Sequence, residues 1–352
     1  MASTDVSRIR LITQHILYQD KATVKELVAW MGAMQAQDFR MVKWAIGVRL
    51  AGSTEKIVEK AMDSGEIIRT HLMRPTWHLV SADDIRWLLD LTAPRIKASL
   101  KSRHRDLEIN NAVLRKSNSL LINALKDNNH LTRDDLVRVF EKEGIPTGDN
   151  RASHLLLFAE LDGLICSGVT KGRNSTYALL DERVPPAKKI ARAEALALLA
   201  RKYFSSHGPA TLQDFIWWSG MPVGDARNAL EMIKSDFVPE KAGEAVLWMP
   251  PSLPEPIPDH STAFLLPAYD EFIISYKDRS ALLSEKNTGK AVSSNGIFRP
   301  VIVVNGKVAG LWSRSYSKSQ VKVETQFFIK PEKHAMTFIE SAIQSYESFY
   351  AG

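Results

Sequence analysis

The sequence contains very little cysteine: of its 352 residues, only Cys166 is one. A single cysteine cannot form a disulfide within the chain, and it cannot build a cysteine-based metal site. Cys166 lies in the apolar segment LDGLICSG, where we expect a small buried hydrophobic residue. The histidines of the sequence do not occur in pairs at the spacing typical of metal ligands. We therefore predict no metal site, and we predict no cofactor.

Long apolar runs are also missing. No stretch approaches the roughly 20 apolar residues that cross a bilayer, and MASTDVSRIR lacks the apolar core of a signal peptide. We therefore expect a cytoplasmic protein without a membrane partner. The excess of positive charge is small, with 46 Lys and Arg against 40 Asp and Glu. The resulting pI of about 9.2 permits an anionic partner without requiring one.

The length predicts two or three domains, and the first begins with helices. Apolar residues recur at helical spacing in SRIRLITQHIL, in TVKELVAWMGAM with Thr23 as N-cap, in FRMVKWAIGVRL and in TEKIVEKAMDSG. EIIRTHLMRPTWHLVS then favours two short strands with a turn at Met73, Arg74 and Pro75. Helices followed by a small hairpin are the order of a winged helix.

The same order recurs twice. SLLINALKDNN, LTRDDLVRVFEKEG and RASHLLLFAELDGLI predict helices, the second starting at Thr132, before a hairpin in ICSGVTKGRNSTYALL. A third copy runs from EALALLARKYFSSHG to VPEKAGEAVLWMP. We predict winged helices over residues 1–110, 111–187 and 188–252.

A proline-rich linker, PSLPEPIPD, precedes a different kind of domain. STAFLLPAYDEFIISY and RPVIVVNGKVAGLWSRS alternate as strands do, with a hairpin turn at Asn305-Gly306, and KVETQFFI is a further strand. PEKHAMTFIESAIQSYESFY predicts a terminal helix. The fold class is therefore α+β: tandem winged-helix modules followed by a β-rich C-terminal domain over residues 260–352.

Three motifs in combination point to a known family. MGAMQAQDF, IIRTHLMRPTWHLVSADDIRWLL and LLPAYDEFIISYKDR resemble the AlkZ/YcaQ family of bacterial winged-helix DNA glycosylases, over nearly the whole chain. The resemblance implies a monofunctional DNA glycosylase that hydrolyses the N-glycosidic bond of N7-alkylated purines. Double-stranded DNA with such lesions is the implied partner, bulky or crosslinked adducts are candidate substrates, and we expect a monomer.

The family's catalytic signature lies between the second and third helices of the first module, as Gln-x-Gln in one branch and Gln-x-Asp in the other. This chain reads Gln35-Ala36-Gln37 and is similar to the AlkZ-like branch. The Gln-x-Asp pattern would place the aspartate at position 37, whereas the aspartate of this chain is Asp38, so the role of Asp38 stays open. Asp38 and Arg40 are candidate DNA or pocket contacts. From the residues alone, Gln35 and Gln37 fit a helix terminus or a solvated face as well.

The chemistry fits two amides. An N7-alkylated purine already carries positive charge and leaves readily, so hydrolysis needs a positioned water more than a strong base. A glutamine amide does not titrate near neutrality, but it accepts a hydrogen bond from water and orients it. A normal purine would need acid catalysis on the leaving base.

Two predicted hairpins carry further candidates. The candidates of the first hairpin are His71, Arg74, Thr76 and His78. Either some of them lie at the mouth of the lesion pocket or on phosphates, or the hairpin packs beneath the catalytic turn. The basic tip TKGRNS of the second contains Lys171 and Arg173. Three alternatives remain open: these two side chains contact DNA, they pack against a neighbouring module, or they are only solvated.

The C-terminal part carries the remaining candidates. SEKNTGKAVSSNGIFR is predicted to be a loop or hairpin tip. By resemblance, a hairpin of this domain can probe DNA near the lesion. The candidate DNA contacts in this segment are Lys286, Lys290, Asn295 and Arg299. We interpret Asp270, Glu271 and Asp278 as structural carboxylates on an extended segment, with Arg279 as an ion-pair partner. Trp217 and Trp218 are predicted to be core residues rather than a base-stacking platform.

A second function remains open from the sequence. A winged-helix transcriptional regulator without enzymatic activity would need an exposed recognition helix to read the major groove. That alternative offers no reason for Gln-x-Gln or for a large C-terminal domain. If both glutamines are buried or face away from basic surface, the regulator is favoured.

Overall fold

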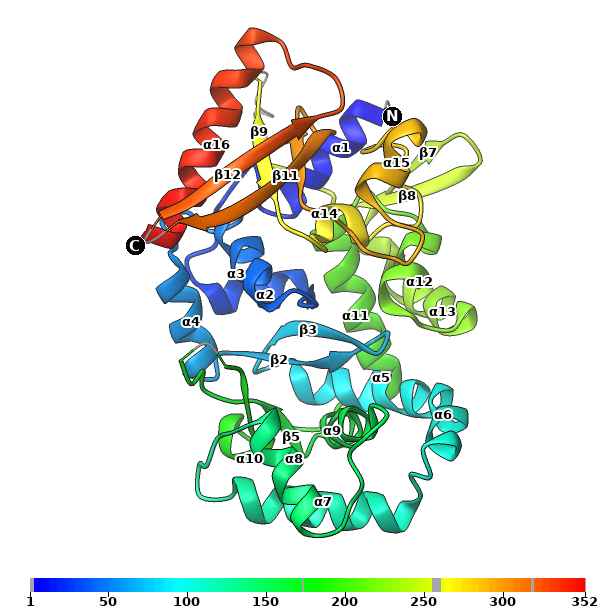
Figure 1. Cartoon of the computed structure of the whole chain (residues 1–352). Coiled ribbons are helices and arrows are strands. Elements are labelled where there is room, and N and C mark those ends of the chain that lie inside the picture. The colour runs from blue at the N-terminus through cyan, green and yellow to red at the C-terminus, as the bar shows by residue number, and fades with distance from the viewer. Residues whose placement is uncertain (1–2, 173, 255–260, 318–319, 352) are drawn as a thin grey trace. The chain divides into compact units, whose positions relative to one another are not determined.

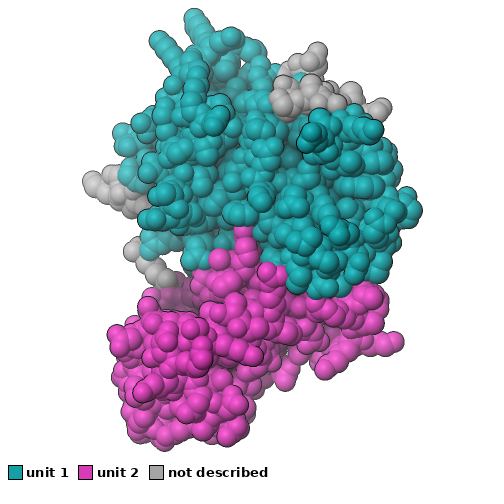
Figure 2. Space-filling view, turned by 90° about the vertical axis from the view of Figure 1, so that its right-hand side faces the viewer, with its two compact units in different colours: residues 1–58, 196–352 teal, residues 59–195 magenta. Residues whose placement is uncertain are grey.

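The computed structural model describes residues 3–172, 174–254, 261–317 and 320–351. Its helices and small antiparallel sheets form two compact units, shown in different colours in Figure 2. Unit 1 combines residues 1–58 with 196–352, and unit 2 comprises residues 59–195. The chain passes between the units within two helices, α4 (Glu55–Asp63) and α11 (Arg192–His207).

This architecture confirms the mixed class of helices and short antiparallel sheets (Figure 1). The two units do not follow the four predicted modules, so the module boundaries stay a proposal. Across the ranges just given, no helix is both long and apolar enough to cross a membrane.

Unit 2 begins with a hairpin of β2 (Ile67–Leu72) and β3 (Thr76–Ser81), paired from Ile67 opposite Ser81 to Leu72 opposite Thr76. The turn between them contains Met73 in the left-handed region, at φ 57°. Two helices that the sequence analysis did not predict follow the hairpin: α5 (Ile85–Ser99) and α6 (Lys101–Asp106). Pro94 lies inside α5, which explains why the helical pattern is hard to recognise there.

The rest of unit 2 follows the predicted order. Its elements are α7 (Asn111–Leu125), β4 (Leu131–Thr132), α8 (Arg133–Lys142), α9 (Arg151–Leu161), β5 (Ile165–Ser167), β6 (Thr176–Leu179) and α10 (Leu180–Arg183), with the strands in the order β4-β6-β5. Thr132 starts α8 as predicted: its hydroxyl accepts the backbone N–H of Asp135, whose carboxylate accepts the N–H of Thr132. Cys166 is buried, as expected, and burial raises the pKa of its thiol to about 12.

Helix α9 lies inside unit 2 because its residues are apolar on nearly every side. Leu155 and Leu156 pack in a core with residues of α7 and α8. Leu157 and Phe158 pack in a second core with Ala93 and other residues of α5. In the predicted winged helix of residues 111–187, α9 would be the helix that reads a groove. Most of its side chains are buried by other residues of unit 2.

Unit 1 begins with α1 (Ser3–Thr13), α2 (Val24–Met31), β1 (Met34–Gln35) and α3 (Phe39–Gly47). After α11 come α12 (Leu212–Ser219), α13 (Val223–Ile233), a 3₁₀ turn (Lys234–Asp236) and a hairpin of β7 (Val238–Ala242) and β8 (Ala245–Met249). Of the two predicted core tryptophans, Trp218 is buried, whereas Trp217 is 36% exposed. The core prediction is therefore confirmed for Trp218 only.

The C-terminal part of unit 1 is a four-stranded antiparallel sheet. Its strands are β9 (Ala263–Leu266), β10 (Val301–Val304), β11 (Lys307–Ser317) and β12 (Gln320–Phe327), in the order β12-β11-β10-β9. Helix α16 (Lys333–Ala351) packs along this sheet (Figure 1). The predicted turn is confirmed, with Asn305 at φ 50° and Gly306 at φ 78° between β10 and β11.

Two predictions for this part were wrong. The segment expected to be extended through residue 276 is a strand only to Leu266, and it then forms the one-turn helix α14 (Glu271–Ile274). The segment expected to be a loop or hairpin tip begins with α15 (Glu285–Ala291), and a bridge between Val292 and Phe298 closes a short turn after it. Most of the proline-rich linker lies outside the described residues.

Candidate active site

The Gln-x-Gln segment is a short connection whose two ends are fixed by helix caps. Helix α2 ends at Gly32, whose φ of 75° suits glycine, and a Cβ at this position would lie 3.3 Å from Lys202 Cβ. Helix α3 begins at Phe39 and is capped by Asp38. Between these ends Gln35 is buried, at 6% exposure, and Gln37 is exposed. The two amides therefore differ in access to solvent.

Asp38 has a clear structural task. Its Oδ1 accepts the backbone N–H groups of Arg40, at 2.9 Å, and Met41, at 3.0 Å. These are two of the N–H groups that a helix start leaves without partners. One oxygen of the Asp38 carboxylate, Oδ1, is thus committed to the start of α3.

Substitution of Asp38 separates capping from catalysis. We expect Asp38→Asn to retain both its stability and the base excision that the resemblance implies, because asparagine caps a helix about as well as aspartate. We expect Asp38→Ala to lower the free energy of unfolding by about 1 kcal/mol, the usual cost of losing a cap. Denaturant unfolding and single-turnover excision measure the two effects. A folded Asp38→Asn protein that no longer excises bases would make Asp38 the catalytic base.

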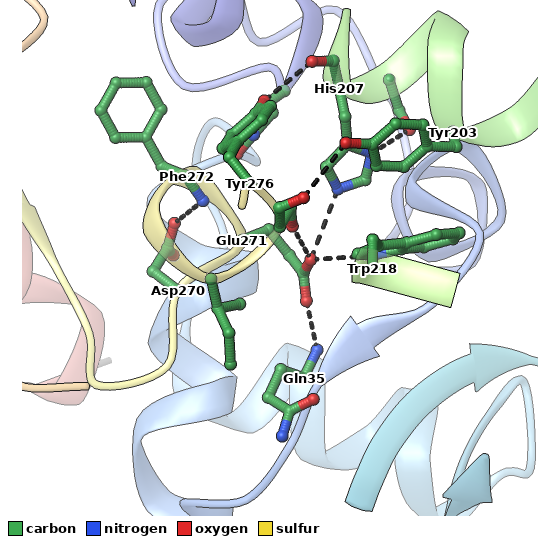
Figure 3. Close-up of polar contacts among 12 residues, drawn as sticks. Gln35, Tyr203, His207, Trp218, Asp270, Glu271, Phe272 and Tyr276 are labelled. Atoms are coloured by element: carbon green, nitrogen blue, oxygen red, sulfur yellow. Dashed lines mark hydrogen bonds and ion pairs between the residues drawn. The ribbon is translucent and has the colours of Figure 1, made fainter. Parts of the chain in front are cut away.

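The backbone of Gln35 is anchored by a carboxylate far away in the sequence (Figure 3). Its backbone N–H donates to Oε1 of Glu271, the first residue of α14, at 2.5 Å. The other oxygen, Oε2, accepts from the indole N–H of Trp218 at 3.2 Å and from the hydroxyl of Ser275. His207 Nε2 lies 3.4 Å from the same oxygen. Figure 3 shows the carboxamide of Gln35 pointing away from this cluster.

The environment keeps Glu271 charged. Burial alone would raise its pKa, but the nearby imidazole of His207 and the hydrogen bonds from Ser275 and the Gln35 backbone lower it to about 2. Burial also raises the pKa of Tyr203. The hydroxyl of Tyr203 therefore stays protonated and donates to the carbonyl oxygen of Ser275 at 3.1 Å.

The neighbouring Asp270 holds a second buried charge. Both of its oxygens accept from Arg49, at 2.7 and 2.8 Å, and its Oδ1 also caps α14 by accepting the N–H of Phe272. Arg49 further donates to Gln14, which donates to the hydroxyl of Tyr276 at 2.9 Å. The predicted partner of these carboxylates was Arg279, and that was wrong for Asp270. Arg279 instead donates to the carbonyl oxygen of Ile273 and lies over the ring of Trp217.

Comparison with known proteins now identifies the family. The family model for DNA glycosylase AlkZ-like proteins matches residues 28–349. The chain belongs to the AlkZ-like family of DNA glycosylases. It is 22% identical over 328 residues to the interstrand DNA cross-link repair glycosylase of Streptomyces sahachiroi, covering 86% of this chain and 85% of that protein.

A solved structure agrees with this assignment. The DNA glycosylase AlkZ of Streptomyces sahachiroi superposes with a TM-score of 0.79 at 18% identity, over 98% of this chain and 95% of that chain. The fold is thus shared along almost the full length. The family resemblance predicted from the motifs is confirmed, and the glycosylase is a hydrolase of N-glycosyl bonds that acts on DNA.

The hairpin candidates of this glycosylase lie in unit 2. Arg74 lies in the turn between the two strands, as predicted, Thr76 is half-buried, and its hydroxyl donates to the carbonyl oxygen of Arg74. His78 is buried, with Nδ1 2.9 Å from the carbonyl oxygen of Thr76. His71 lies 2.6 Å from the buried Glu160. Burial raises the pKa of Glu160, and the charge of His71 opposes this effect. All of these contacts lie within unit 2, and a contact of the hairpin with DNA stays a proposal.

The basic candidates are mostly on the surface. Lys171 is exposed, but its ammonium donates to the carbonyl oxygen of His130 at 2.6 Å, while Arg173 lies outside the described residues. In unit 1 the exposed candidates are Arg40, Lys286, Lys290, Asn295 and Arg299. The carbonyl oxygen of Arg40 accepts the hydroxyl of Tyr350, so the terminal helix α16 contacts the first turn of α3.

The sequence identifies Glu271 as a structural carboxylate but does not reveal its partners. Two adjacent carboxylates in a segment rich in aromatic residues were a usable signal, since such charges need partners when buried. The partners, Gln35 and Arg49, lie more than 200 residues away in the sequence. Among the described residues, no cluster of three or more His, Cys, Asp or Glu side chains could hold a metal ion.

Proposed function

We propose that this glycosylase hydrolyses the N-glycosidic bond of N7-alkylated purines in duplex DNA, with Gln35 and Gln37 positioning the attacking water. The observation that carries the proposal is the Gln-x-Gln turn, in which Gln37 is exposed while Gln35 is buried and held by Glu271. An exposed amide on a fixed backbone can accept a hydrogen bond from water and orient it toward C1′.

The proposed substrate follows from what an amide can and cannot do. A cationic purine needs no proton on its leaving group, whereas a normal purine does. A site built on amides would therefore act on charged lesions and spare undamaged bases. We propose a monofunctional enzyme, in which water rather than an amine of the protein attacks the sugar.

The relative from Streptomyces sahachiroi is named an interstrand DNA cross-link repair glycosylase. We propose that bulky and crosslinked N7 adducts are also substrates here. Flipping a base out of the duplex costs a few kcal/mol of unstacking, and a bulky adduct hinders it. A site that works from the groove would avoid both difficulties.

The proposed DNA-binding scaffold is a tandem of winged helices over residues 1–110, 111–187 and 188–252, followed by the C-terminal domain of residues 260–352. The helix and strand order of residues 111–179 and 192–249 supports two of these modules. Exposed candidates for phosphate contacts are Arg40, Lys286, Lys290 and Arg299. We propose that the enzyme acts as a monomer in the cytoplasm.

The alternative, a regulator that reads sequence, has less support. In the second proposed module, the helix that would enter the major groove is α9, and most of its side chains are buried within unit 2. Such a helix cannot present a row of polar side chains to base edges.

The deciding experiment uses a duplex with a single N7-methylguanine. We expect the wild-type protein to release the damaged base and leave an abasic site, which alkali converts to a strand break. The readout is the fraction of strand cleaved after alkali, with undamaged duplex of the same sequence as control. Equal cleavage of both duplexes, or of neither, would contradict the proposal.

A further inference from the structure

A buried carboxylate contacts the backbone of the turn that carries the two glutamines. Glu271 is 2% exposed, and its Oε1 accepts the backbone N–H of Gln35 at 2.5 Å. A hydrogen bond from an N–H to an ionised carboxylate is among the stronger kinds in proteins. It constrains the backbone two residues before Gln37.

The groups around Glu271 suit a carboxylate. Its other oxygen faces the indole N–H of Trp218, the hydroxyl of Ser275 and the imidazole of His207. An ionised carboxylate only accepts hydrogen bonds, so it satisfies the N–H groups on both sides at once. A glutamine at this position would turn its NH₂ toward the N–H of either Gln35 or Trp218.

Glu271 is itself held in place from several elements. Asp270 caps α14 and forms the bidentate pair with Arg49 of the segment after α3. The hydroxyl of Tyr276 donates to the carbonyl oxygen of His207 at 2.8 Å, which ties the end of α14 to α11. The carboxylate is therefore a fixed point to which the turn is attached.

We propose that Glu271 is a positioning residue for base excision: it fixes the backbone of Gln35, and through it the direction of the Gln37 amide toward the attacking water. This inference rests on the proposed function and adds a residue to it. A displacement of about 1 Å in a water-orienting group costs on the order of 10²-fold in rate. DNA affinity, which comes from phosphate contacts elsewhere, should not depend on Glu271.

The test compares three variants in single-turnover excision, DNA binding and thermal unfolding. Glu271→Gln removes the charge, and Glu271→Asp keeps the charge but withdraws the carboxylate from Gln35. The matched control is Asp214→Asn, which alters another buried carboxylate of unit 1. Asp214 accepts the backbone N–H of Lys277 at 2.9 Å.

We expect both Glu271 variants to excise N7-methylguanine about 10²-fold more slowly, with a DNA Kd within about twofold of wild type. Asp214→Asn should lower the melting temperature and leave the excision rate near wild type. The inference is overturned if a folded Glu271→Gln protein excises within about threefold of wild type. It is also overturned if rate, affinity and stability fall together, as expected of a purely structural residue.

A measurement on the wild-type protein covers the case in which the variants do not fold. In protein labelled with ¹⁵N-glutamine, the backbone amide of Gln35 is assigned as the signal lost in Gln35→Ala. We expect its proton to resonate downfield and to exchange at least about 10³-fold more slowly than a free amide, as stable native hydrogen bonds do. Exchange at the rate of an open loop would overturn the inference.

The two proposals can fail separately. If the wild-type protein does not release N7-methylguanine while the Gln35 amide is protected and shifted downfield, the proposed substrate is wrong and the anchor remains. If the wild-type protein excises and the amide is unprotected, the positioning role of Glu271 is wrong.

Discussion

Gln37→Ala is expected to lower the single-turnover rate of N7-methylguanine excision by about 10²-fold while leaving DNA affinity nearly unchanged. Gln37 is the exposed amide of the turn, so its side chain can reach a water from the solvent. A residue that orients the attacking water acts mainly in the transition state, and its loss should leave phosphate contacts intact. The measurement is excision at saturating enzyme, paired with a DNA-binding titration.

Two comparisons sharpen this result. Gln35→Ala should also slow excision, and the double variant should lose less than the product of the two single effects, because both residues act on one water. Gln213→Ala removes an exposed glutamine from α12 of the same unit and should excise as wild type does. Near-normal excision by Gln37→Ala would show that the water is positioned by another group.

Arg49→Met is expected to have the largest effect on stability. The substitution leaves the buried Asp270 charge without its bidentate partner and leaves the side-chain oxygen of Gln14 without its donor. Removing one partner of a buried ion pair typically costs about 3–5 kcal/mol. We expect a fall of that size in the free energy of unfolding, measured by denaturant titration.

A double-mutant cycle shows whether the lost pair is the cause. Arg49→Met combined with Asp270→Asn should be less destabilised than the sum of the single variants, because no unpaired charge remains. As a surface control, Lys234→Met removes an exposed ion pair with Glu231 and should change stability little. A wild-type unfolding midpoint for Arg49→Met would show that the buried pair adds nothing to stability.

The features that the sequence predicts best are those decided by neighbouring residues. Thr23 and Thr132 each cap a helix through a partner three residues on, and both are capping boxes in the structure. Asn305 and Gly306 define their turn by their own backbone preferences. In these cases the stabilising contact lies within the pattern itself.

The features that the sequence predicts poorly depend on distant residues. The segment around Asp270 alternates as a strand does, yet it turns into α14 because Asp270 caps that helix and pairs with Arg49, 221 residues away. Likewise, the pattern identifies Gln35 and Gln37 as a motif but cannot tell which amide is buried. That difference depends on tertiary packing around Gln35, including its contact with Glu271 of α14, which no local pattern contains.

The anchor of Gln35 has a consequence for synthesis of the chain. The two residues that form it are 236 positions apart, so the contact cannot exist while the N-terminal part alone has been translated. At about 5–20 residues per second, a ribosome needs roughly 10–50 s to reach Glu271 after Gln35. During that interval the nascent chain contains Gln35 and Gln37 but not Glu271, whose carboxylate accepts the backbone N–H of Gln35. Fragments that end before α14 therefore contain the signature of the enzyme but not its support.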